Sequence, residues 1–182
     1  MSAARLTEIV AGTPILMDML RAVETVGLPD AWIAAGTIRS AVWDTLHGRP
    51  VATDWADIDV LFFDKVDVSR EREAAAEAKL AALMPGLPWE VRNQSRMHLK
   101  TGLPPYADTE DGLRHFAETP TAVGVRLRDA HIEIIAPHGL DDLFAMVSRP
   151  VFTDDHMMGF YRQRMTSKHW PARWPQVRVL GL

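Results

Sequence analysis

The stretch Thr53-Asp54-Trp55-Ala56-Asp57-Ile58-Asp59-Val60-Leu61-Phe62-Phe63 decides the fold. Ile58, Val60 and Phe62 alternate with the residues between them, which is the period of a β-strand with one face in a core. Side chains two positions apart on a strand point to the same side, so Asp57 and Asp59 share the opposite face. The segment therefore predicts a strand that presents two neighbouring carboxylates.

The two acids suggest a metal site. Burying like charges side by side is costly unless a cation lies between them. A hard cation such as Mg²⁺ takes carboxylate oxygens readily and keeps positions open for water and phosphate. An Asp-x-Asp triplet also arises by chance on solvated edge strands, so this segment alone leaves both interpretations open.

A second motif lies upstream, where the apolar run Trp32 to Ala35 predicts a short strand and Gly36 a tight turn. The helix that follows has its apolar residues on one side and ends at Gly48. Free N–H groups at its start, the Thr37 hydroxyl and the Arg39 guanidinium are suited to hold a phosphate. The alternative is a plain turn capped by Thr37.

Later strands supply candidates for a third acid. The segment Trp89 to Gln94 puts Glu90 and Arg92 on one face of a strand, and Glu133 lies on another predicted strand. Either glutamate could instead be an exposed charge on an amphipathic strand.

Strands and helices are interspersed, which predicts an α/β (α+β) fold with a mixed sheet flanked by helices. We expect a single domain over residues 1–182, with a core at about 14–150 and a C-terminal extension, 151–182, packed on it. The remaining predicted elements are a helix from Thr13-Pro14 to Gly27, a helix capped by Ser69 and ending at Pro85-Gly86, a loop over Thr101–Asp111, strands over Val123–Leu127 and Ile132–Ile135, and a helix over Gly139–Val147.

Composition narrows the function classes. The chain has 182 residues, of which 47% are apolar and 24% charged, as in an ordinary globular protein. The absence of cysteine excludes disulfides, thiolate metal sites and a cysteine nucleophile. A net charge of −4 gives no broad attraction to nucleic acid or anionic membranes. With no apolar run long enough for a membrane span and no secretory signal at Met1–Glu8, we expect a cytoplasmic protein that does not bind membranes.

Taken together, these motifs resemble the DNA polymerase β-type nucleotidyltransferase superfamily and, more closely, a bacterial family of small nucleotidyltransferase-like proteins. The resemblance runs from about residue 14 to the C-terminus. The matching segments are residues 35–48, 57–60, 89–98, 121–125 and 136–144, and the Trp-Pro pair at 174–175.

The resemblance implies a nucleotidyltransferase-like sheet and a two-metal transfer site. Asp57 and Asp59 would bind two Mg²⁺ (or Mn²⁺) ions, and a third carboxylate would complete the site. We favour Glu90, which lies 31 residues after Asp59 inside a matching segment, and keep Glu133 in reserve. The nucleotide-binding residues predicted on this basis are Gly36, Thr37, Arg39, Asn93 and Arg96.

Two features depart from the superfamily pattern. Thr37 replaces the more usual Ser or Gly, and the 21-residue interval from Gly36 to Asp57 is longer than is common. The long interval suggests an altered acceptor pocket.

The main hypothesis is transfer of a nucleoside monophosphate from an NTP to an unknown hydroxyl acceptor, which could be a small molecule, a protein or an RNA. One alternative is a nucleotide sensor of the same fold that has lost transfer. Another is a glycosyltransferase that binds a nucleotide sugar through Asp-x-Asp, although that class usually needs a larger nucleotide-binding domain. The sequence leaves the oligomeric state open.

Overall fold

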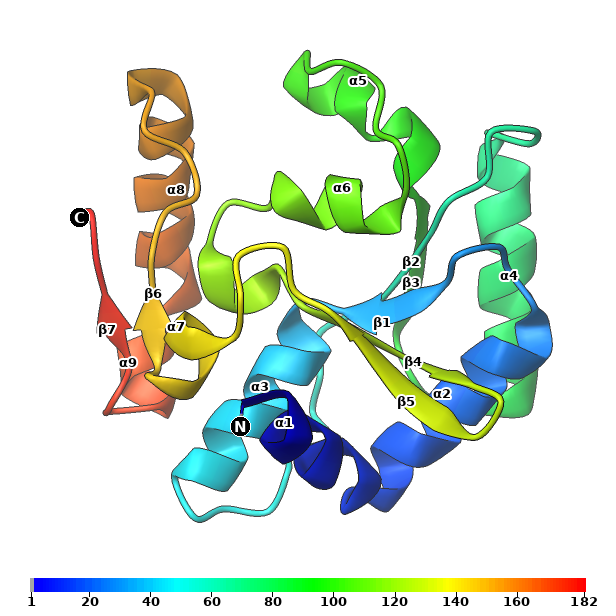
Figure 1. Ribbon diagram of the computed structural model, residues 1–182, viewed down its shortest axis with the longest axis horizontal. Helices are drawn as coiled ribbons and strands as arrows, with labels where there is room; N and C mark the ends of the chain where they lie inside the picture. Colours follow the sequence, from blue (N-terminus) through cyan, green and yellow to red (C-terminus); the bar gives the residue numbers. More distant parts are fainter. Residues whose placement is uncertain (1) are drawn as a thin grey trace.

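A mixed five-stranded sheet organises the computed structural model, which describes residues 2–182 (Figure 1). The strand order is β3-β2-β1-β4-β5, with β2 and β3 parallel and the other neighbouring pairs antiparallel. Its strands are β1 (Trp32–Ala34), β2 (Ile58–Phe62), β3 (Trp89–Asn93), β4 (Gly124–Arg128) and β5 (His131–Ile135). The predicted α/β class with a mixed sheet is confirmed.

Helices and short segments connect and cover these strands. The N-terminal half contains α1 (Ser2–Ala11), α2 (Pro14–Val26), α3 (Gly36–Leu46) and α4 (Arg70–Leu83). The middle contains the 3₁₀ turn η1 (Gln94–Arg96), α5 (His98–Thr101), α6 (Thr109–Arg114) and the 3₁₀ turn η2 (Thr119–Thr121). The C-terminal part contains α7 (Asp141–Phe144), β6 (Val147–Ser148), α8 (Asp155–Lys168), α9 (Trp170–Arg173) and β7 (Arg178–Val179).

Local sequence signals set several boundaries as predicted. Pro14 is the first residue of α2, and Gly27 ends that helix with a left-handed φ of 69°. The Ser69 hydroxyl accepts a hydrogen bond from the backbone N–H of Arg72 and so caps α4. The Thr13 side chain does not cap α2, because its hydroxyl donates to the Ile9 carbonyl.

Three segments differ from the sequence-based expectations. Helix α1 was not predicted, although its Leu6 is fully buried. Helix α6 begins inside the predicted loop, because the Asp108 side chain accepts from the Asp111 N–H and caps it. Helix α7 is shorter than predicted, because Val147 leaves the helix to pair with Arg178 in a small parallel ladder.

Each face of the large sheet packs in a different way. Ile58, Val60 and Phe62 have no exposed surface and pack among side chains of the N-terminal helices, as the alternation predicts. On the other face, Leu61 and Ala34 pack with Leu113 of α6. This second apolar layer covers only part of that face, and Asp59 lies on the remainder.

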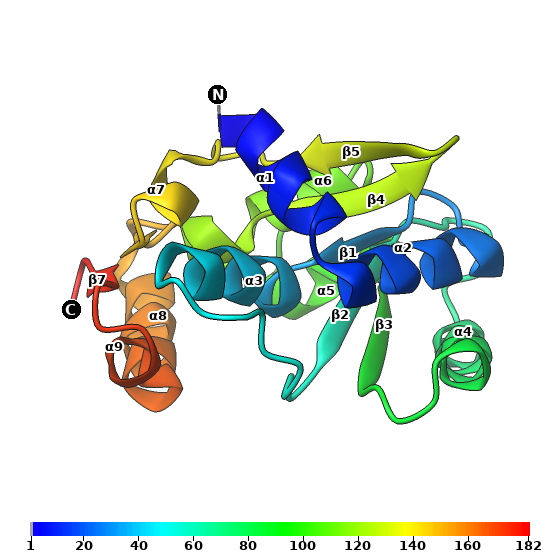
Figure 2. The ribbon, with the colours of Figure 1, turned by 90° about the horizontal axis from the view of Figure 1, so that it is seen from below.

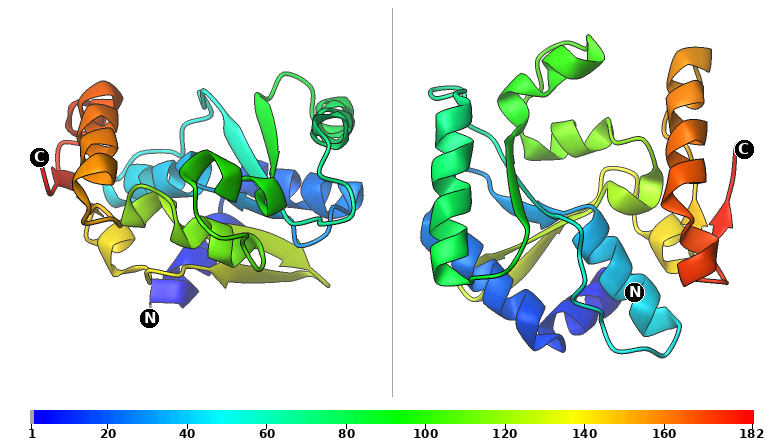
Figure 3. Two further views of the ribbon diagram at one scale, coloured as in Figure 1. Left: turned by 90° about the horizontal axis from the view of Figure 1, so that it is seen from above. Right: turned by 180° about the vertical axis from the view of Figure 1, so that it is seen from behind.

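The C-terminal segment packs on α3. Figures 1 and 2 show α8 and α4 at opposite ends of the molecule, with the sheet between them. In the right-hand view of Figure 3, α9 lies beside α3. The fully buried ring of Trp43 meets those of Trp170 and Trp174 edge-on, at centroid distances of 5.3 and 5.2 Å. The two C-terminal tryptophans thus extend the main core.

Among the described residues, no helix combines the length and the apolar character that crossing a bilayer requires.

The packing of Trp170 predicts that the C-terminal segment and the core unfold together. Trp170→Ala should lower the free energy of unfolding by about 3–5 kcal/mol, since the ring is 3% exposed. Urea titration should show one transition by both circular dichroism and tryptophan fluorescence. Leu99→Ala, at a 75% exposed position, is the control and should change stability by less than about 0.5 kcal/mol. Separate transitions for the tail and the core would contradict the prediction.

Candidate active site

A pocket of about 650 Å³ opens where the sheet, the start of α3 and the C-terminal helices meet. Its walls come from segments far apart in the sequence, including β2, β3, the loop before β2, η2, α8 and α9. The residues that line it are Ala35, Gly36, Arg39, Ser40, Asp54, Trp55, Ala56, Asp57, Asp59, Glu90, Met97, Phe116, Ala117, Glu118, Thr121, Phe160, Arg164, Lys168, Trp170, Arg173 and Trp174.

The acidic side of the pocket is built by the parallel strands β2 and β3. Asp59 stands directly opposite Glu90 in their register, and Asp57 immediately precedes β2. Partial burial of Asp59, together with the negative charges of Asp57 and Glu90, raises the pKa of the Asp59 carboxyl to about 7. Three acids predicted from the sequence therefore line one pocket, and the charges of two of them contribute to the raised pKa of the third, Asp59.

Asp57 and Asp59 have no protein partner within residues 2–182: neither carboxylate forms a hydrogen bond or an ion pair there. Most carboxylates in this structure that are partly buried are paired, as Glu73 is with Arg96. Carboxylate oxygens that have no protein partner in a pocket are available to a ligand.

Glu90 is partly engaged. Its Oε1 lies 2.7 Å from a guanidinium nitrogen of Arg92, which also binds Glu77 at 3.0 Å. In the described part of the chain, no three acidic or histidine side chains are arranged closely enough to form a ready-made metal site. The three acids share the pocket without converging on one point.

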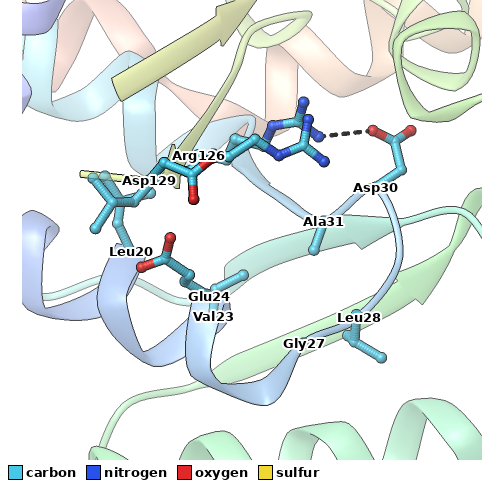
Figure 4. Close-up of a pocket in the computed structure, with 11 residues that line it drawn as sticks. Leu20, Val23, Glu24, Gly27, Leu28, Asp30, Ala31, Arg126 and Asp129 are labelled. Carbon is cyan, nitrogen blue, oxygen red and sulfur yellow. Dashed lines mark hydrogen bonds and ion pairs between the residues drawn. The ribbon is translucent and has the colours of Figure 1, made fainter. Parts of the chain in front are cut away.

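Glu133, the reserve candidate, lies on β5 at the opposite edge of the sheet from Glu90. Its Oε2 accepts from Arg126 Nε at 2.6 Å, and Arg126 also pairs with Asp30 at 3.1 Å. Figure 4 shows the second of these pairs in a separate pocket of about 180 Å³. The structure therefore brings Glu90, and not Glu133, to the Asp-x-Asp pair.

The turn into α3 forms another side of the pocket. Ala35 has φ 55° and ψ −124°, a strained conformation for a residue with a Cβ. Gly36 has no positive φ, and a Cβ on it would meet only Arg39 Nη2, at 3.9 Å. Neither backbone conformation nor packing requires glycine here, so its effect is to leave the start of α3 open to the pocket. Thr37 is fully buried beneath the turn, and its hydroxyl has no hydrogen-bond partner among the described residues.

Arg39 is a buried cation in the pocket wall. It is 7% exposed, its Cζ lies 4.4 Å from the centre of the Trp170 ring, and burial lowers the pKa of its guanidinium to about 10. Nη2 donates to the Ser40 hydroxyl at 3.0 Å, whereas Nε has no partner among residues 2–182. A buried guanidinium without a carboxylate partner is suited to bind an anion.

Three of the five predicted nucleotide-binding residues do not line the pocket: Thr37 is buried beneath the turn, and Asn93 and Arg96 have protein partners elsewhere. The fully buried Asn93 donates from Nδ2 to the Asp64 carbonyl at 2.8 Å and accepts from the Asp64 N–H. Arg96 forms an ion pair with the buried Glu73. Both side chains instead hold the loop after β2 and the start of α4 against β3.

Several pocket residues were not predicted from the sequence. Glu118, which has no exposed surface, holds Arg164 through contacts of 3.0 and 3.1 Å. The ring nitrogen of Trp55 is buried at the pocket without a partner in the described part of the chain. An isolated Glu in a coil carries no motif, so no sequence signal pointed to Glu118. The basic pocket residues of α8 and α9, Arg164, Lys168 and Arg173, likewise belong to no motif.

Comparison with known proteins assigns the family. A family profile described as Nucleotidyltransferase matches residues 21–179. The chain belongs to this nucleotidyltransferase family. The resemblance inferred from the motifs is thus confirmed, and the chain is a nucleotidyltransferase enzyme.

Solved structures agree with this nucleotidyltransferase assignment. One, an NMR structure described as revealing a CCA-adding enzyme head domain, is 32% identical with a TM-score of 0.84 and covers 96% of this chain and 93% of that chain. Another, described as a tRNA-processing enzyme (apo form 2), is 17% identical with a TM-score of 0.54. It covers 88% of this chain and 44% of that chain, and shows likeness of fold alone. No curated protein matches the sequence significantly.

Because the pKa of Asp59 is raised, the free energy of unfolding of the nucleotidyltransferase should depend on pH when no metal is added. The folded state holds the Asp59 proton more tightly than the unfolded state, so this group lowers stability as pH rises from about 4 to about 7. Asp59→Asn should match the wild type near pH 4 and be more stable at pH 8, by about 2–4 kcal/mol.

Thermal unfolding with EDTA, followed from pH 4 to 8, measures this difference. Glu24→Gln, which removes an exposed acid without an ion pair among the described residues, is the control variant. An equal Tm difference for Asp59→Asn at every pH would show that Asp59 does not carry the predicted charge cost.

Proposed function

We propose that this nucleotidyltransferase transfers a nucleoside monophosphate from an NTP to a hydroxyl acceptor in the pocket described above. The observation that supports the proposal is that groups of opposite charge line the same pocket. Two carboxylates without protein partners, Asp57 and Asp59, line it together with a buried cation, Arg39, that has no ion pair within residues 2–182. A metal–triphosphate complex fits both groups, because its cation can bind the carboxylates and its phosphates can bind Arg39.

The acidic side fits a divalent cation such as Mg²⁺ or Mn²⁺. Its donors are hard carboxylate oxygens. Burial of Asp59 and the neighbouring negative charges raise its pKa, and a bound cation would offset both effects. When bound, divalent ions would neutralise charge on the attacking and leaving oxygens. We assign Asp57, Asp59 and Glu90 as ligands. If Glu90 turns from Arg92 toward a cation, Arg92 keeps its contact with Glu77.

The opposite side fits the phosphates. The start of α3 offers N–H groups beside Gly36, and the Arg39 guanidinium has an unpaired Nε. Thr37 is buried beneath this turn, and its hydroxyl has no hydrogen-bond partner among the described residues. We propose that these groups orient the triphosphate so that its α-phosphorus faces the acceptor.

In the proposed reaction, the acceptor oxygen attacks the α-phosphorus and pyrophosphate leaves. The hydroxyl loses its proton as it attacks, and a carboxylate of the pocket accepts that proton. Phosphoryl-type transfer depends mainly on positioning and charge stabilisation, which fits a pocket that contains no nucleophilic cysteine.

An RNA hydroxyl is the acceptor that we propose to test before a small molecule or a protein. The similar NMR structure is described as a CCA-adding enzyme head domain. The exposed cations Arg162 and Arg178 lie on the C-terminal elements α8 and β7 and could contact an RNA backbone.

Isothermal titration calorimetry tests the nucleotide site. The wild type should bind a non-hydrolysable NTP in the presence of Mg²⁺, and Asp57→Asn with Asp59→Asn should weaken binding by more than about tenfold. Glu24→Gln, far from these acids, is the matched control. Equal binding by the double variant and the wild type would overturn the metal assignment.

Activity measurements distinguish the two candidate third acids. With an RNA acceptor and radiolabelled NTPs, Glu90→Gln should lower kcat/KM by about 100-fold or more, because a carboxylate that acts in the transition state is lost. Glu133→Gln should retain near wild-type activity, because Glu133 pairs with Arg126 at the other edge of the sheet. The reverse result would move the third acid to Glu133.

A further inference from the structure

Helix α8 presents an ordered stripe to the pocket. It contributes three residues to the lining, Phe160, Arg164 and Lys168, and these are spaced by four. Residues four apart lie on one helix face, about 6 Å apart along the axis. An aromatic ring therefore comes first, followed by two cations one and two turns further on.

Phe160 is not needed to pack α8. Its side chain is 52% exposed, whereas Tyr161 and Met165 are 1% and 5% exposed and attach the helix to the C-terminal ladder. The Tyr161 hydroxyl lies within hydrogen-bond distance of two backbone carbonyls, 3.1 Å from that of Ser148 and 2.9 Å from that of Leu180. The helix is thus anchored by its buried face, and the Phe160 ring is left available at the pocket wall.

The two cations of the stripe have different surroundings. Arg164 is held by the buried carboxylate of Glu118, which fixes the helix face toward the pocket and compensates the charge. Lys168 is exposed and forms no ion pair among residues 2–182. The uncompensated positive charge therefore lies at the α9 end of the stripe, the end at which Arg39 contacts Trp170.

We propose that Phe160 stacks on the nucleobase of the bound nucleotide while Lys168 contacts its phosphates. The inference rests on the proposed function and adds the wall that recognises the nucleoside. A ligand with a flat ring at one end and anionic groups at the other matches an exposed aromatic followed by cations along one helix face. Because every base has a π-face, stacking of this kind binds different bases with similar strength.

The test separates the ring from the phosphates. Wild type and Phe160→Ala are titrated by calorimetry with a non-hydrolysable ATP analogue, a CTP analogue and inorganic tripolyphosphate, each with Mg²⁺. Phe160→Ala should weaken binding of both nucleotides by about tenfold and leave tripolyphosphate unchanged. Phe160→Trp should retain nucleotide binding, and Lys168→Gln should weaken all three ligands alike.

Gln163→Ala is the matched control, since Gln163 is exposed on the same helix and does not line the pocket. Unchanged nucleotide affinity in Phe160→Ala would overturn the proposal and would be the result if the ring stacks on the acceptor instead. Equal losses for nucleotides and tripolyphosphate would also overturn it, because they would indicate a displaced helix. Failure of the wild type to bind tripolyphosphate or nucleotide would instead reject the proposed function.

Discussion

Crowding of like charges at the junction of β2 and β3 is the constraint on which the candidate site depends. The parallel register sets Asp59 opposite Glu90, and the chain brings Asp57 to the same pocket. The strand tolerates this because its other face is fully buried, so that Ile58, Val60 and Phe62 hold the backbone in place. A fold that keeps unpaired acids together at a cost in stability is typical of a functional site.

The C-terminal segment completes the pocket by packing on α3. Trp43, Trp170 and Trp174 surround Arg39, and Trp174 Nε1 donates to Asp44 at 2.8 Å. The other oxygen of Asp44 accepts from the Ala52 N–H in the long loop before β2. One carboxylate thereby ties the loop and the tail to the same helix, which relates the long interval before Asp57 to the shape of the pocket.

The elements with strong local signals were the predictable ones. The alternation around Val60, the Pro14 start of α2 and the Ser69 cap each depend on neighbours in the sequence. The ladder between β6 and β7 was missed because it pairs strands that are distant in the sequence. Helix α6 was missed because its start is also fixed by hydrogen bonds from Thr109 to the distant Asp30. Asn93 and Arg96 belong to a matching segment, yet their protein partners, Asp64 and Glu73, are residues that no periodicity could pair with them.

By itself, the sequence determined the mixed sheet, the shared face of Asp57 and Asp59, and the nucleotidyltransferase family, because strand alternation and short motifs are local properties of the chain. Tertiary structure decided which glutamate accompanies the aspartates, since only strand order separates Glu90 on β3 from Glu133 on β5. It also decided that α8 and Glu118 form the facing wall. Side chains far apart in sequence meet through packing, which residue patterns along a single chain do not encode.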